Sequence, residues 1–93
     1  MVGKIKSGVG IIFDKTNYKV VRKSGVKGDV IPTHNHEGKE IVFIVMQGSA
    51  EVILNEEEKY NLNKFDVLNF DGVNTMSVKF IVDSEIVIIL VKK

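Results

Sequence analysis

The chain has 93 residues, a net charge of +1, and 44% apolar and 27% charged residues, which is the composition of an ordinary globular domain rather than of a disordered segment. It contains no cysteine, which excludes disulfides, iron–sulfur ligation and thiol nucleophiles. Its lysines are scattered, its longest apolar run (residues 86–91) is too short to cross a bilayer, and its first residues lack the apolar segment of a signal peptide. We therefore expect a cytoplasmic protein with no nucleic-acid or membrane partner.

Short β-branched runs separated by Gly, Asn, Asp and Ser follow one another along the chain, and no stretch has the spacing of an amphipathic helix. They predict strands over residues 10–14, 18–22, 29–33, 41–47, 50–54, 59–62, 66–70, 75–82 and 85–91. Turn residues at 47–49, 55–57 and 83–84 favour antiparallel pairing of consecutive strands. The pattern indicates an all-β sandwich or barrel in a single domain, residues 1–93, with its core at about residues 10–91.

The last predicted strand is apolar on both of its faces. A strand with one face in the core and the other in water would alternate. Either an N-terminal strand covers the second face, or that face is buried against another subunit. We expect a homodimer.

The segment from Gly28 to Glu40 contains both histidines of the chain. Residues two apart on a strand point to the same face, so His34 and His36 can direct two imidazoles at one metal ion. Glu40 would complete a set of two histidines and one carboxylate, with Glu37 as an alternative carboxylate in the same loop. The competing interpretation is that the histidines are polar residues at a strand end and bind no metal.

These residues form a pattern that resembles the first motif of the cupin family: Gly28, His34-x-His36, Glu40 and then Gly48 after an apolar strand. Between Glu40 and Gly48 the chain has one residue more than the family's usual spacing. Asp66 and Gly72 resemble part of the second motif, and Met76, or Thr75 with a shorter spacing, stands where that motif supplies a third histidine.

The resemblance implies a small single-domain cupin, with an antiparallel β-barrel of the double-stranded β-helix or jelly-roll type. It also implies a divalent metal (Fe, Mn, Ni, Cu or Zn) at His34, His36 and Glu40, and a small organic ligand in the barrel. Cupins include dioxygenases, isomerases, decarboxylases and sugar-binding regulatory domains, so the resemblance selects no reaction. The alternative is a metal-free module that binds a small molecule or carbohydrate, or acts as a sensor, without catalysis.

Overall fold

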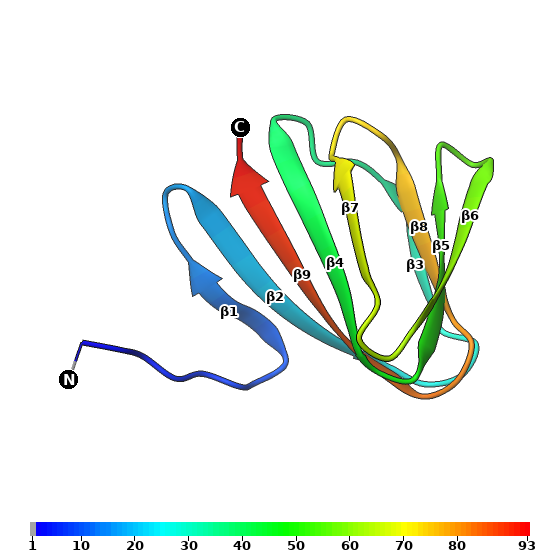
Figure 1. Cartoon of the computed structure of the whole chain (residues 1–93), viewed down its shortest axis with the longest axis horizontal. Helices are drawn as coiled ribbons and strands as arrows, with labels where there is room; N and C mark the ends of the chain where they lie inside the picture. The colour runs from blue at the N-terminus through cyan, green and yellow to red at the C-terminus, as the bar shows by residue number, and fades with distance from the viewer. Residues whose placement is uncertain (1) are drawn as a thin grey trace.

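The computed structural model describes residues 2–93, which form nine strands and no helix (Figure 1). None of these residues belongs to a helix long and apolar enough to span a membrane. The strands are β1 (Gly10–Asp14), β2 (Tyr18–Gly25), β3 (Val30–His34), β4 (Lys39–Gln47), β5 (Ser49–Leu54), β6 (Glu58–Asn63), β7 (Val67–Asp71), β8 (Met76–Phe80) and β9 (Ser84–Lys92). Each predicted strand is present, with ends shifted by a few residues.

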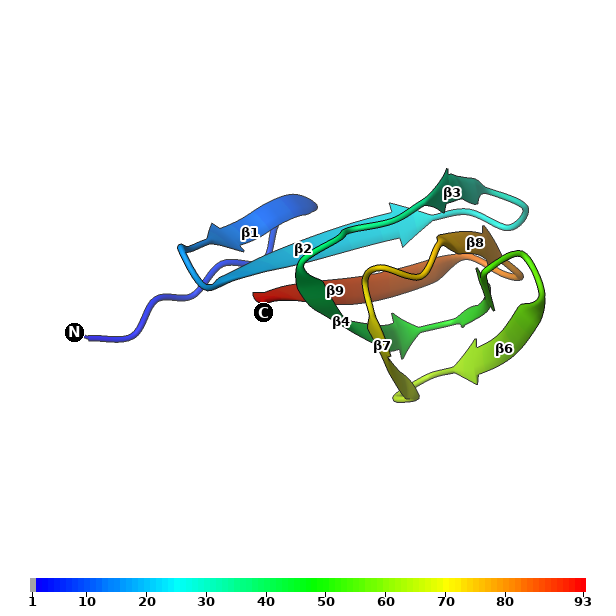
Figure 2. The ribbon, with the colours of Figure 1, turned by 90° about the horizontal axis from the view of Figure 1, so that it is seen from above.

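The strands form two antiparallel sheets that face each other (Figure 2). One sheet has five strands in the order β1-β2-β9-β4-β7, and the other has four in the order β3-β8-β5-β6. Among strands adjacent in sequence, only β1 with β2 and β5 with β6 are paired. The prediction that consecutive strands pair throughout is therefore wrong, because most connections cross from one sheet to the other.

The difference lies in the geometry of the turns. In the β5–β6 hairpin the two central residues, Asn55 and Glu56, have φ angles of 53° and 61°, as a type I′ turn requires. The β4–β5 connection instead turns a corner at Gly48, whose φ is +84°. That corner meets the β8–β9 corner, where the Ser84 hydroxyl accepts a hydrogen bond from the Ser49 amide at 3.0 Å. The single proton of this hydroxyl has two acceptors in reach, the Val82 carbonyl at 2.8 Å and the Ser49 carbonyl at 3.1 Å.

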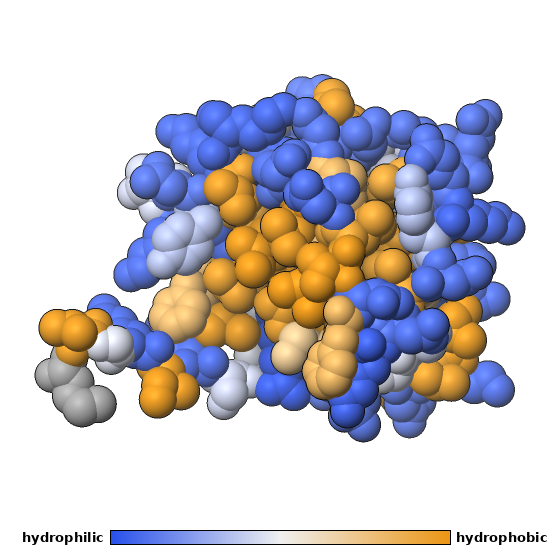
Figure 3. Space-filling view, viewed as in Figure 1, coloured by the Kyte–Doolittle hydropathy of each residue, from blue (hydrophilic) through white to orange (hydrophobic). Residues whose placement is uncertain are grey.

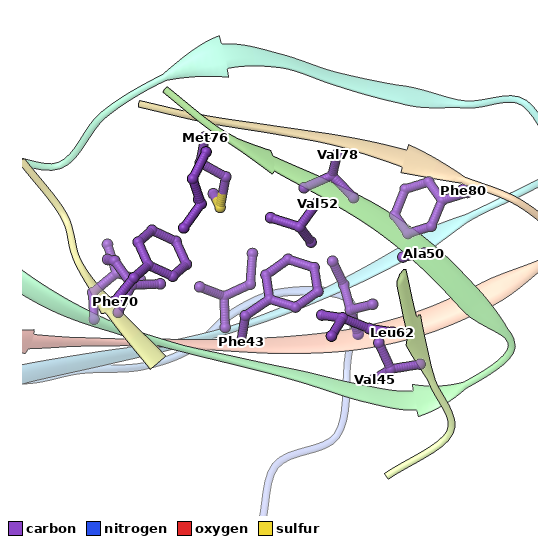
Figure 4. Close-up of a cluster of buried hydrophobic side chains, with 14 residues drawn as sticks. Phe43, Val45, Ala50, Val52, Leu62, Phe70, Met76, Val78 and Phe80 are labelled. Atoms are coloured by element: carbon purple, nitrogen blue, oxygen red, sulfur yellow. The ribbon is translucent and has the colours of Figure 1, made fainter. Parts of the chain in front are cut away.

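The core lies between the two sheets and is made by alternate residues of the strands. In β4, for example, Ile41, Phe43 and Val45 are fully buried and their neighbours are not. Figure 4 shows Phe43 near the middle of the cluster, with Met76 and Phe70 toward one end. The buried apolar set is Ile41, Phe43, Val45, Ala50, Val52, Leu54, Leu62, Phe70, Met76, Val78, Phe80, Ile86, Ile88 and Leu90.

The last strand, β9, buries one face in this core and leaves Val87 and Ile89 half-buried on the other. The N-terminal strand β1 pairs only with β2, at the edge of the five-stranded sheet. It does not cover the outer face of β9, so the first of the two explanations for an apolar last strand does not hold.

Candidate functional site

A cavity of about 370 Å³ opens where the two sheets diverge, between the inner face of β2 and β9 and the strand β3. No hydrogen-bonded pairing joins β2 to β3, so the sheets can separate there. Aliphatic side chains form most of the cavity wall, and two histidines and three lysines supply its polar groups. The lining residues are Ile11, Lys19, Val21, Lys23, Ile31, His34, His36, Lys39, Ile88 and Leu90.

A β-bulge directs His34 into this cavity. Ile31 pairs with Val78 and His34 pairs with Met76, so the register shifts between Ile31 and His34. The two positions are three apart in sequence, and in a regular strand they would face opposite sides of the sheet. The extra residue of the bulge restores His34 to the inner side.

The two imidazoles lie together as the spacing predicts. The ring centroids of His34 and His36 are 4.8 Å apart and the rings are perpendicular. Nδ1 of His34 lies 2.7 Å from the carbonyl oxygen of Pro32. If Nδ1 carries the proton and donates it to this carbonyl, Nε2 keeps a free lone pair, which is the tautomer of a metal-binding or hydrogen-bond-accepting histidine.

Glu40 does not join the histidines. Because Ile41 points into the core, Glu40 lies on the outer face of β4, where it pairs in register with Asp71 and Val91. The residue that lies on the inner side of β4 and lines the cavity is Lys39. Within residues 2–93 no three His, Cys, Asp or Glu side chains gather in an arrangement that could hold a metal ion.

The loop that carries His36 and Lys39 is fastened to the turn after β7. The His36 amide donates to the Gly72 carbonyl at 2.8 Å, and the Gly72 amide donates to the Lys39 carbonyl at 2.8 Å. A Cβ atom at residue 72 would lie 2.8 Å from the Lys39 carbonyl oxygen and closer still to that of His36. Only glycine permits this approach, so Gly72 helps to place both cavity residues.

The cavity is electropositive. Burial lowers the pKa of His36 below 6.5, and electrostatic repulsion from His34, Lys19, Lys23 and Lys39 lowers it further, in that order. All four groups therefore act on the same ring. No aspartate or glutamate belongs to the lining.

A larger hollow of about 490 Å³ lies elsewhere, beside the loops after β2 and β8, and its walls include Asp29 and Asp83. Those carboxylates already accept hydrogen bonds from the Val26 and Lys27 amides, at 3.0 and 2.9 Å. They hold loops in place. The histidine cavity is the better candidate because its polar side chains converge on an apolar wall.

No family model and no curated protein matches the sequence. Solved structures do match. KdgF from a Halomonas species superposes with a TM-score of 0.80 at 23% identity, over 89% of this chain and 76% of that chain. A cupin family protein with a double-stranded β-helix fold from Methanocaldococcus jannaschii superposes with a TM-score of 0.84 at 14% identity, over 99% of this chain and 93% of that one. The chain has the cupin fold. An RmlC-like cupin from Desulfovibrio desulfuricans agrees, with a TM-score of 0.82 at 18% identity, over 88% and 78% of the two chains.

In this domain the position at which the cupin motif would place a third histidine is part of the core. Met76 is 2% exposed and packs with the buried apolar cluster. Thr75, the alternative position, donates its amide hydrogen to the side chain of Asn55 at 3.1 Å, in the turn before β8. Two imidazoles are thus the only metal-binding side chains that residues 2–93 direct into the cavity.

The three lysines of the cavity are not evident as site residues from the sequence. Lys19 and Lys23 flank Val21 on the inner side of β2, where their partners in β9 are Leu90 and Ile86. The alternation Lys-x-Val-x-Lys was the available signal, but the same pattern is typical of a strand face in water. Only the position of β2 in the cupin fold shows that this face borders a cavity.

Proposed function

We propose that this cupin domain binds a small organic molecule in the cavity between β2, β9 and β3. The observation that carries the proposal is the lining, in which aliphatic residues form the wall and five side chains that can donate hydrogen bonds converge on it. A volume of about 370 Å³ is in the range of small-molecule sites.

The test is an NMR screen of the untagged, isotope-labelled protein against neutral sugars, amides, amino acids and carboxylates. We expect a hit to shift the resonances of Val21, Ile31 and Ile88, which line the cavity, and to leave those of Ile53, on the outer face of the four-stranded sheet, unchanged. The double variant His34→Ala/His36→Ala should bind the hit more weakly. Shifts confined to surfaces outside the cavity would refute the proposal.

A divalent metal ion at His34 and His36 is the second candidate. Two imidazoles that bind one ion, with each nitrogen about 2.1 Å from it, place their ring centroids about 4.6 Å apart when the two ligands are at right angles and about 5.3 Å apart at a tetrahedral angle. The observed 4.8 Å agrees with this, as does the contact from Nδ1 of His34 to Pro32. The donor set fits only in part, because three protein ligands are usual and three lysines surround the pair.

Elemental analysis and calorimetric titration with Zn²⁺, Mn²⁺, Ni²⁺, Cu²⁺ and Fe²⁺ test this candidate. Binding near one ion per chain that is lost in His34→Ala/His36→Ala would support it. Equal uptake by the wild type and the double variant would exclude the histidine pair as a metal site.

We also propose that a second copy of the chain covers the outer face of the five-stranded sheet. Figure 3 shows apolar residues gathered at the centre of this face, over β4 and β9. Charged groups at its two ends are already paired: Arg22 with Glu85, and Lys93 with Asp71. A face with an apolar centre and balanced charge does not repel its own copy, as a twofold interface requires.

Sedimentation analysis at micromolar concentration tests this pairing. We expect a dimer that Ile89→Glu, at the centre of the face, converts to a monomer with an unchanged fold. The matched control is Ile53→Glu on the outer face of the other sheet, which should leave the dimer intact. A monomeric wild-type protein would refute the proposal.

A further inference from the structure

Resting on the proposed function, we infer that the ligand of the cavity is an anion, a small organic carboxylate whose charge is held by Lys19, Lys23 and Lys39 and whose apolar part packs against the aliphatic wall. The charge of the lining is the first observation. Acidic residues are almost as numerous as basic ones in the chain, 12 against 13, yet the cavity has three lysines and no carboxylate. A random selection of the chain's charged residues would contain acidic side chains as often as basic ones.

The three lysines come from two strands and reach one space. Lys19 and Lys23 belong to β2, where one lies two residues before Val21 and the other two residues after it. Lys39 is the first residue of β4 and follows the loop that carries His36. Other cations in the same sheet have carboxylate partners, as Arg22 has in Glu85 and Lys93 in Asp71. In the part of the chain that the structure describes, no ion pair or side-chain hydrogen bond engages the lysines of the cavity.

Positive groups that converge on a concave surface raise the local potential, and an anion that enters lowers the repulsion among them. The same lysine cluster has little effect on the binding of a neutral sugar and strongly disfavours the binding of a free cation. The inner-side position of Lys39 is decisive here, because a carboxylate at that place would have made the cavity suitable for a cation.

The remaining chemistry favours a carboxylate over a phosphate. Lysines bind phosphate as well as carboxylate, but many phosphate sites add backbone amides at a helix N-terminus, and residues 2–93 contain no helix. The wall formed by Val21, Ile31, Ile88 and Leu90 suits an aliphatic body attached to the anionic group. Phosphate ions lack such a body.

The experiment compares matched pairs of probes: aliphatic carboxylates of four to eight carbons, such as 4-methylpentanoate, and their neutral amides, with inorganic phosphate as a third arm. Binding is measured from the NMR shifts of Val21, Ile31 and Ile88 at low ionic strength. We expect at least one carboxylate to bind ten-fold or more tightly than its amide and than phosphate, and to weaken as salt is added. The triple variant Lys19→Met/Lys23→Met/Lys39→Met should abolish this preference.

Lys79→Met is the matched control, because Lys79 is exposed on β8 and lies outside the cavity. It should leave carboxylate binding unchanged, and thermal unfolding should show that the triple variant is folded. An amide that binds in the cavity as tightly as its carboxylate overturns the anion inference and leaves the proposed function standing. Tighter binding of phosphate overturns the choice of carboxylate. Failure of every carboxylate to shift a cavity resonance overturns the carboxylate inference, whereas the proposed function is overturned only if the sugars, amides and amino acids of the first screen also leave these resonances unchanged.

Discussion

Substitution of Gly72 by alanine tests how the fold places the candidate site. The new Cβ would lie 2.8 Å from the Lys39 carbonyl oxygen and closer to that of His36, so the loop that carries both residues has to move. Gly72 is buried, and its φ is not among the positive values of the chain. The cost therefore comes from crowding and not from an unfavourable backbone conformation.

The magnitude follows from three contributions. Overpacking costs about 1–3 kcal/mol, and the two hydrogen bonds between Gly72 and the loop contribute about 0.5–1.5 kcal/mol each. Alanine restricts the unfolded chain, which offsets about 0.4–1 kcal/mol. We expect a net loss of about 2–4 kcal/mol in the free energy of unfolding, or a fall in Tm of roughly 10–30 °C for a domain of this size.

Urea denaturation and thermal unfolding measure this loss, and amide spectra of the folded fraction should show displaced His36 and Lys39 resonances. Gly8→Ala is the control, because a Cβ at that position meets no atom within 4 Å. It should stay within about 0.5 kcal/mol of the wild type. A Gly72→Ala variant equally close to the wild type would show that the contact with the His36 loop does not constrain the site.

Three further predictions follow from the same geometry. The pKa of His36 in the folded protein should lie below 6.5, so the unfolded chain binds more protons as the pH falls. The free energy of unfolding should therefore decrease as the pH drops from above 6.5 through the folded-state pKa. An NMR titration midpoint of His36 at or above 6.5 would contradict this. Phe43→Ala, at a side chain with no exposed surface, should cost about 3–5 kcal/mol in urea denaturation, and a loss below about 2 kcal/mol would mean that the core collapses around the gap. Lys39→Glu places a carboxylate on the inner side beside the histidines, so calorimetry should show at least ten-fold tighter Zn²⁺ binding than in Lys39→Gln. Equal affinities would mean that residue 39 does not reach the pair.

The strands could be predicted from the sequence because each combines β-branched residues with turn residues at its ends. The sheet order could not. Asn55-Glu56 forms a hairpin and Gly48 forms a corner between sheets, yet both are turn signals of the same kind in the sequence. What separates them is the partner of the next strand, which depends on long-range packing such as the contact between Ser49 and Ser84.

The part of the site that lies within one strand alternation, His34 and His36, could be predicted from the sequence, and the part beyond it could not. His34 and His36 are two residues apart and their rings meet, although a bulge and a loop, not a regular strand, bring them together. Between His36 and β4 the chain turns at Gly38, whose φ is +80°, and the alternation of the earlier strand does not continue through such a turn. The sequence therefore allowed Glu40 on the inner side, and the structure has Lys39 there.

That one-residue difference changes the chemistry that the cavity can perform. A carboxylate at the inner position would balance part of the positive charge and complete a ligand set for a cation. A lysine there adds a third ammonium group to the two of β2, and it repels a free cation from the imidazoles that could have bound it. A metal ion could enter such a site most easily together with an anion, whose charge the lysines would hold. Metal and carboxylate binding would then be coupled, each increasing the affinity for the other by the same factor.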